Sequence, residues 1–133
     1  MLRRSRAREV AMQLLFQSDQ NPGMGRPAVE RFVQERLREA ALRNFCLRLF
    51  DGAILQRGAI DEAVQTAAEN WKIARMAAVD RNVLRLGAYE LMFETAETPA
   101  AVAIDEAIEL ARRFGSADSP GFVNAILDRI RKR

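Results

Sequence analysis

Apolar residues recur three and four positions apart over most of the sequence, and residues 98–130 show this pattern most clearly. The repeat forms two stripes, which consist of Ile104, Ala107, Ile108 and Ala111, and of Val123, Ile126, Leu127 and Ile130. This spacing places each set on one face of an α-helix. We therefore expect a helix that Thr98 caps and Pro99 opens, and a second that Asp118 or Ser119 caps. Between them, Gly115 is expected to adopt the left-handed conformation that ends a helix.

The same periodicity predicts helices elsewhere and no strands. A first helix should start near Ser5, and a second should open at Pro27 after a loop rich in glycine. Residues 29–65 form a long helical stretch with an expected break near Gly58, and an irregular segment follows from Trp71 to about Ala78. A further helix is expected over about 79–95. The chain is therefore predicted to be all-α, a single domain (1–133) of six or seven helices, with subdomains of about 1–70 and 71–133.

Composition argues against catalysis. The 133 residues contain no histidine and one cysteine, Cys46, which excludes a zinc site and a Ser/His or Cys/His nucleophile from this chain. No glycine-rich phosphate loop occurs either, so we expect no enzyme activity, no metal and no cofactor. No apolar run approaches the roughly 20 residues of a membrane span, and no secretory signal opens the chain. A cytoplasmic protein with a reduced, buried Cys46 is expected.

The net charge of +3 conceals an uneven distribution. Basic residues gather at the two ends, as Arg3, Arg4, Arg6 and Arg8 and as Arg129, Arg131, Lys132 and Arg133. Removing these eight from the 21 basic residues leaves 13, against 18 acidic residues. The positive excess therefore lies entirely at the termini, and it would form a polyanion site if the termini converge. Two solvated tails are the alternative.

Four side chains do not fit a simple amphipathic pattern. Phe122 lies about 90° from the centre of its helix's apolar stripe, so it is either a core-edge residue or an exposed ring that stacks on a base. Phe16 also points away from its stripe and is either core edge or a partner contact. Arg85 and Glu90 stand among apolar neighbours, and a buried charge requires a partner. We expect each of the two to be paired.

Three segments, in order, resemble the NusB family of bacterial transcription antitermination factors. These are RSRAREVAMQLLF (4–16), VDRNVLRLGAYEL (79–91), and VAIDEAIELARRFG followed by DS and FVNAILD (102–128). The likeness is weakest over about 20–70. Two departures are visible, because Asp105 stands where the family often has Asn, and Ala125 where it usually has Gly. The resemblance implies two small helical bundles that share one core.

The resemblance also implies a function. The protein would bind the boxA element of single-stranded ribosomal RNA leaders together with NusE, a ribosomal small-subunit protein, and would act with other Nus factors and RNA polymerase to read through terminators. The residues implied for RNA binding are Arg3, Arg4, Arg6, Arg8, Asp118 and Phe122, and those implied for NusE binding are Phe16 and Asp80.

Two alternatives come from other classes. One is an accessory RNA-binding domain like those fused ahead of RNA cytosine methyltransferases, which needs a methyl-donor loop and a nucleophilic cysteine that these residues do not supply. The other is a protein-only helical scaffold, which would leave the terminal arginines unexplained.

Overall fold

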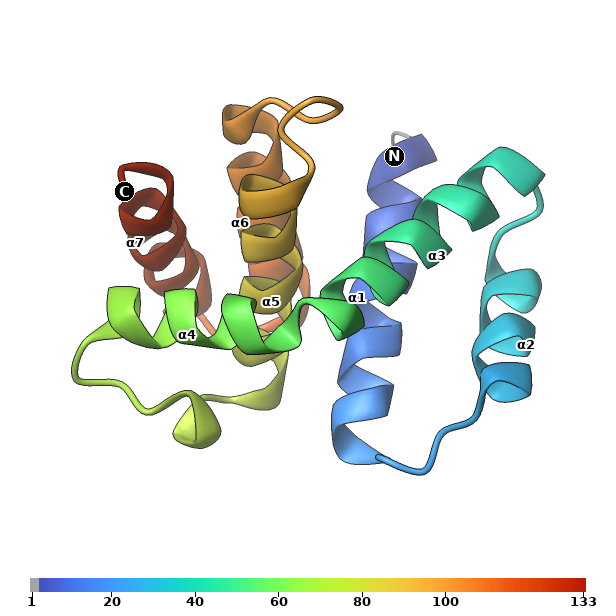
Figure 1. The fold of residues 1–133 in the computed structure, drawn as a ribbon, viewed down its shortest axis with the longest axis horizontal. Coiled ribbons are helices and arrows are strands. Elements are labelled where there is room, and N and C mark those ends of the chain that lie inside the picture. The colour runs from blue at the N-terminus through green and yellow to red at the C-terminus, as the bar shows by residue number, and fades with distance from the viewer. Residues whose placement is uncertain (1–2) are drawn as a thin grey trace.

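The computed structural model describes residues 3–133, and this range contains seven α-helices, one 3-10 helix and no strand (Figure 1). In chain order the elements are α1 (Arg3–Gln20), α2 (Arg26–Arg36), α3 (Ala40–Leu55), α4 (Arg57–Ala68), η1 (Ile73–Arg75), α5 (Ala78–Phe93), α6 (Ala100–Phe114) and α7 (Ser119–Arg131). The predicted all-α class and helix number are confirmed. Most predicted boundaries agree to within two residues, and the break expected near Gly58 lies at Gln56.

Helix α5 is the centre of the fold, because it packs against α1, α3, α4, α6 and α7. Its nine consecutive residues Asn82–Glu90 are all buried, so the helix has no solvent-facing side over that stretch. The buried charges on it are paired, as expected: Arg85 with Asp61, and Glu90 with Arg8. Buried apolar residues from both ends of the chain form one hydrophobic cluster around this helix.

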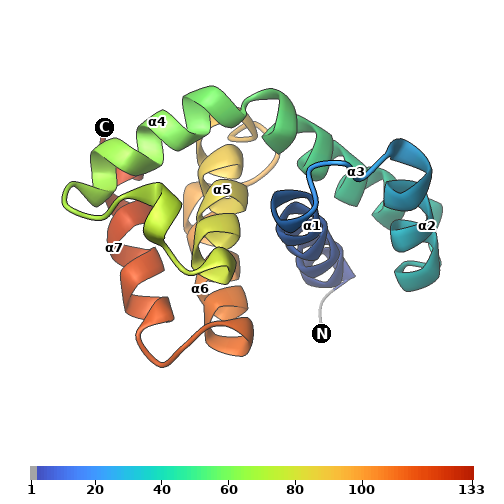
Figure 2. The same cartoon turned by 90° about the horizontal axis from the view of Figure 1, so that it is seen from below.

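The packing partners change at the junction of α3 and α4. Helix α3 packs mainly on α1, whereas α4 packs on α5 and α7, and the two helices follow each other along one edge of the molecule (Figures 1 and 2). The junction residue is Gln56, so the change lies before the subdomain boundary predicted near residue 70. That boundary stays a prediction.

The turn between α6 and α7 differs from the one predicted. Gly115 has φ −97° and ψ −164°, which is extended and not left-handed backbone. A side chain is excluded there for another reason, since a Cβ atom would lie 2.8 Å from the Ala111 carbonyl oxygen. Asp118 occupies the N-cap position of α7 without a side-chain cap, and Ser119 Oγ instead accepts a 2.9 Å hydrogen bond from the Ser116 N–H.

The start of α6 also differs. Pro99 is the N-cap residue and no side chain caps the helix. Thr98, the predicted cap, is buried at 2% exposure, and its side chain opposes the rise that burial causes in the pKa of Glu90. The hydroxyl therefore lies beside a buried carboxylate in the centre of the fold and does not cap the helix.

Candidate nucleic-acid interface

Phe122 forms one wall of a hollow at the N-terminal end of α7. The ring is half-buried, and its inner side packs against the hydrophobic cluster. Trp71 meets it edge to face, with ring centroids 5.9 Å apart and planes at 82°. Trp71 itself is 62% exposed. The hollow has a volume of about 390 Å³ and is lined by Trp71, Arg75, Met76, Ala77, Asp80, Asp118 and Phe122. Both interpretations of Phe122 are thus partly met, because the ring is core edge on one side and pocket wall on the other.

Two carboxylates face this aromatic hollow. Asp118 is exposed and makes no cap hydrogen bond, so its oxygens are open to an incoming donor. Asp80 lies in the first turn of α5, and its Oδ1 atom is buried without a hydrogen-bond partner among the described residues. A buried acceptor without a donor is uncommon in native proteins. The hollow therefore combines flat apolar walls with the exposed carboxylate of Asp118, which is chemistry that can hold a base bearing an amino group.

Three of the four predicted N-terminal arginines are at the surface. Arg3 pairs with Glu39 on an open face, where the Arg3 side chain is 67% exposed. Arg4 lies over the Phe45 ring at 4.5 Å. Arg6 donates to Glu9 at 2.6 Å and its side chain is 38% exposed. The exposed pair of Arg3 is weak in water, and Arg3 and Arg4 therefore remain available to a polyanion, whereas Arg6 is held by Glu9, whose side chain is 6% exposed.

Arg8 does not belong to this surface. It is 4% exposed, and its Nε and Nη2 atoms donate to the Glu90 carboxylate at 2.9 and 3.1 Å. Glu106 lies 3.6 Å from its Nη1 atom. Burial raises the pKa of Glu90, and the hydrogen bond and charge of Arg8 oppose that rise. This burial argues against the predicted contact of Arg8 with RNA, because the guanidinium already neutralises a buried carboxylate.

The two basic ends of the chain do not converge. The start of α1 and the end of α7 lie well apart in both views of the fold (Figures 1 and 2). Arg129 donates to the Ala67 carbonyl oxygen at 2.8 Å, and Lys132 pairs with Asp128 at 2.9 Å. The condition under which the two basic ends would form one polyanion site is therefore not met, and the C-terminal cations belong to another face.

Helix α6 connects the surface arginines with the aromatic hollow. Ser5 donates to Glu106 at 2.6 Å, and Arg113 donates to Glu9 at 2.8 Å, so α6 runs beside α1. Arg113 is followed closely by the α6–α7 turn, which carries Asp118. Arg6 and Arg113 both pair with Glu9, so a strip of charged side chains on α1 and α6 links the start of α1 with the end of α6.

Phe16 lines a different hollow from Phe122. It is half-buried, and the hollow, of about 370 Å³, is bounded by Met12, Gln13, Phe16, Gln17, Phe32, Arg36, Val79 and Phe114. Val79 precedes Asp80, so the two predicted protein-contact residues lie near the same end of α5. Asp80 nevertheless faces the hollow of Phe122. This carboxylate stands between the two predicted surfaces.

Trp71 is the residue of this interface that the sequence interpretation missed. It lies in the segment between α4 and α5, where the broken periodicity indicated only a subdomain boundary. A lone tryptophan in a polar, irregular segment was the available signal, since a large ring outside any apolar stripe is either a contact residue or a cover for the core.

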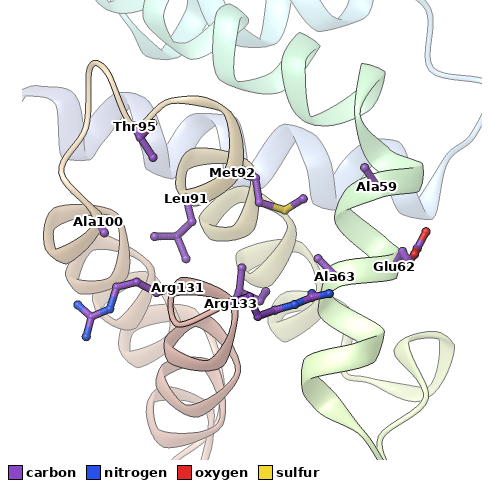
Figure 3. Close-up of a pocket in the computed structure, with 10 residues that line it drawn as sticks. Ala59, Glu62, Ala63, Leu91, Met92, Thr95, Ala100, Arg131 and Arg133 are labelled. Atoms are coloured by element: carbon purple, nitrogen blue, oxygen red, sulfur yellow. The ribbon is translucent and has the colours of Figure 1, made fainter.

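A third hollow contains none of the predicted site residues. It has a volume of about 620 Å³ and lies among α4, α5 and the end of α7, with Leu91 and Met92 on its floor (Figure 3). Arg131 and Arg133 extend in different directions at its rim (Figure 3).

Within residues 3–133, no helix combines the length and apolar character that crossing a membrane requires.

Comparisons with known proteins agree over nearly the whole chain. The family model described as "NusB family" matches residues 5–132. The "Transcription antitermination protein NusB" of Sorangium cellulosum is 45% identical over 127 residues, which cover 96% of this chain and 90% of that protein. The protein of the same name from Geobacter sulfurreducens is 44% identical over 92% of this chain and 89% of its own length.

Two solved structures have the same fold. The structure described as "T. maritima NusB, P3121, Form 2" superposes with a TM-score of 0.87 at 38% identity, and covers 100% of this chain and 92% of that chain. That of "Antitermination Factors NusB and NusE in complex with dsRNA" superposes with a TM-score of 0.88 at 25% identity, and covers 99% and 98%.

Proposed function

The chain belongs to the NusB family, and on that premise we propose that it is an antitermination factor that binds boxA RNA of ribosomal RNA leaders together with NusE. The observation that carries the proposal is the hollow between Trp71 and Phe122, where two aromatic walls stand beside the open carboxylate of Asp118. The protein would act in the cytoplasm as a binding module, with other Nus factors and RNA polymerase, and would catalyse no reaction.

The surface arginines and the hollow have separate tasks in this proposal. Arg3, Arg4 and Arg6 attract phosphates, which sets affinity and its salt dependence but carries no sequence information. A base of the single strand enters the hollow and stacks on Phe122 or Trp71. Asp118 accepts a hydrogen bond from an amino group on the base edge, which favours bases that carry one. The strand would follow the strip along α1 and α6.

The proposed NusE contact consists of the N-terminal end of α5, where Asp80 lies, and the hollow of Phe16. One of the similar structures is a complex of NusB and NusE with dsRNA, and this supports the same pair of partners for this chain. Phe16 presents half of its ring to an apolar hollow of about 370 Å³, a suitable seat for an apolar side chain of the partner. Asp80, next to Val79, would supply a polar contact at the edge.

The test compares Phe122→Ala with Phe114→Ala, because both rings are half-buried but Phe114 lies in the other hollow. Each change should cost less stability than the roughly 3–5 kcal/mol of a fully buried ring. Phe122→Ala should also weaken boxA RNA binding by about 1–3 kcal/mol, or about 5- to 150-fold, while Phe114→Ala should not. RNA titrations with a scrambled control measure this, and equal affinities for the two variants would contradict the proposal.

A second arm of the test removes Arg3, Arg4 and Arg6 together. Binding to boxA and to scrambled RNA should weaken alike, and the slope of affinity against salt should fall by about one unit for each phosphate that no longer meets a cation. Unchanged affinity at low salt would show that these cations do not meet RNA.

A further inference from the structure

The segment that carries Trp71 has little support from its own backbone. It follows α4 through Glu69, whose φ of 53° is the single positive value among the non-glycine residues described. An L-residue adopts this conformation at a cost in free energy, so the surrounding structure must impose it. Only the short helix η1 gives the segment regular structure, with hydrogen bonds such as that from the Met76 N–H to the Ile73 carbonyl oxygen at 3.2 Å.

The Gln65 side chain of α4 hydrogen-bonds to the backbone of this segment on both sides of Lys72. Its Nε2 atom donates to the Trp71 carbonyl oxygen at 2.9 Å, and its Oε1 atom accepts from the Ile73 N–H at 2.9 Å. One amide side chain thus pairs a backbone N–H and a backbone carbonyl oxygen that lie outside any α-helix. These two bonds fix the peptide groups next to the Trp71 ring.

Arg81 of α5 holds the other end of the segment. Its Nη1 atom donates to the carbonyl oxygens of Met76 at 3.0 Å and Ile73 at 3.3 Å. Its Nε atom donates to Asp19 Oδ2 at 2.8 Å, and Asn82 donates to the same oxygen at 3.0 Å. Burial raises the pKa of Asp19, but the hydrogen bonds of Asn82 and Arg81 outweigh it and lower the pKa overall. Asp19 is therefore an anchor on α1 that aims the guanidinium at the segment.

We propose that Gln65 and Arg81 are positioning residues for RNA recognition, because they hold the segment so that Trp71 stands against Phe122 before RNA arrives. Neither residue lines the hollow, so each acts through Trp71. A wall that is already fixed loses little conformational entropy on binding, and a loose wall must be ordered by the RNA. The inference rests on the proposed function. It adds that the base site is held from α4 and α5, and through Asp19 from the helix that carries Phe16.

The experiment uses Trp71 as its own reporter, since it is the single tryptophan of the chain. Gln65→Leu keeps the size and charge of the side chain while it removes both hydrogen bonds, and Thr66→Ala on the exposed side of the same helix is the matched control. Gln65→Leu should raise collisional quenching of Trp71 fluorescence and lower its anisotropy. It should also weaken boxA RNA binding by about 3- to 10-fold, the effect of about one ordinary hydrogen bond.

Arg81 is tested with Arg81→Lys, which keeps the positive charge and the pairing with Asp19 but loses the planar fork that reaches two carbonyl groups. It should show the same two changes, to a lesser extent. Quenching and affinity equal to those of Thr66→Ala would overturn the inference, as would a loss of stability alone. If Phe122→Ala weakens RNA binding and Gln65→Leu does not, the positioning role fails while the proposed function stands. If neither variant weakens binding, both fall.

Discussion

The buried pair of Arg8 and Glu90 allows the sharpest test of how this fold uses its arginines. Arg8 is 4% and Glu90 2% exposed, and three hydrogen bonds of 2.9–3.2 Å join them. Arg8→Met keeps the length of the side chain but leaves the carboxylate inside the protein without its cation. Breaking a buried pair in this way costs about 3–5 kcal/mol. Because a domain of this size has a total stability of about 5–15 kcal/mol, the melting temperature should fall by about 10–20 °C.

The surroundings of Glu90 make the loss of stability in Arg8→Met depend on pH. Without Arg8, Glu90 loses the hydrogen bonds and the charge that oppose the effect of burial on its pKa. The pKa of Glu90 in the folded state then rises further above its unfolded value. A carboxyl group with a raised folded pKa favours folding at low pH and loses that contribution as the pH rises through the folded pKa. The deficit of Arg8→Met should therefore be smaller near pH 5 than near pH 8.

The assay is urea unfolding of four proteins: the wild type, Arg8→Met, Glu90→Met and the double variant. The double variant should recover most of the lost stability, since replacing both charges with apolar side chains is often neutral. The folded fraction of Arg8→Met should bind RNA with wild-type affinity. Wild-type stability combined with a loss of RNA affinity would refute the reasoning and return Arg8 to the RNA surface.

Five further outcomes follow from single positions. Burial raises the pKa of Cys46 to about 12, so only about one thiol in ten thousand is ionised near pH 8, and alkylation followed by mass spectrometry should be slow until the protein unfolds. The lowered pKa of Asp19 adds stability at neutral pH that is lost as the pH falls through its folded value, so the stability difference between wild type and Asp19→Asn should shrink in acid denaturation. Phe16→Asp should abolish NusE binding in a pull-down and retain helical circular dichroism, whereas unfolding would show that the ring is core. Gly52→Ala should destabilise the protein because its Cβ would lie 2.6 Å from Tyr89 Cε1, and Gly58→Ala, with no atom within 4 Å, should stabilise α4 by about 0.5–1 kcal/mol in thermal melts.

The positions of the helices in this protein follow from the sequence. Helix positions depend on apolar spacing and on breakers within a few residues, and these are properties of the chain itself. The sequence also showed that Arg85 and Glu90 would each need an oppositely charged or hydrogen-bonding partner, because a charge among apolar residues becomes buried when the chain folds. Cys46 was predicted to be buried from its apolar neighbours Phe45 and Leu47, and it is 0% exposed. The family was evident from three motifs in order, and the family model confirms it.

Only the tertiary structure decided what each side chain faces. Arg6 and Arg8 are two positions apart on one helix, yet one meets solvent and the other meets Glu90, 82 residues away. At about 100° per residue the helical period already places these two positions on opposite faces of α1. That Arg8 meets Glu90, and not another group, depends on where α5 crosses α1. The separation of the two basic ends is likewise a result of helix packing.

The position of Trp71 was also not predictable from the sequence. Its segment has no periodicity, and its place beside Phe122 depends on contacts from Gln65 and Arg81 on two other helices. Sequence patterns report a residue's relation to its own helix, through spacing and propensity. Partners across the fold are chosen by the simultaneous packing of several helices, and so the pairing of this ring with Phe122 exists only in three dimensions.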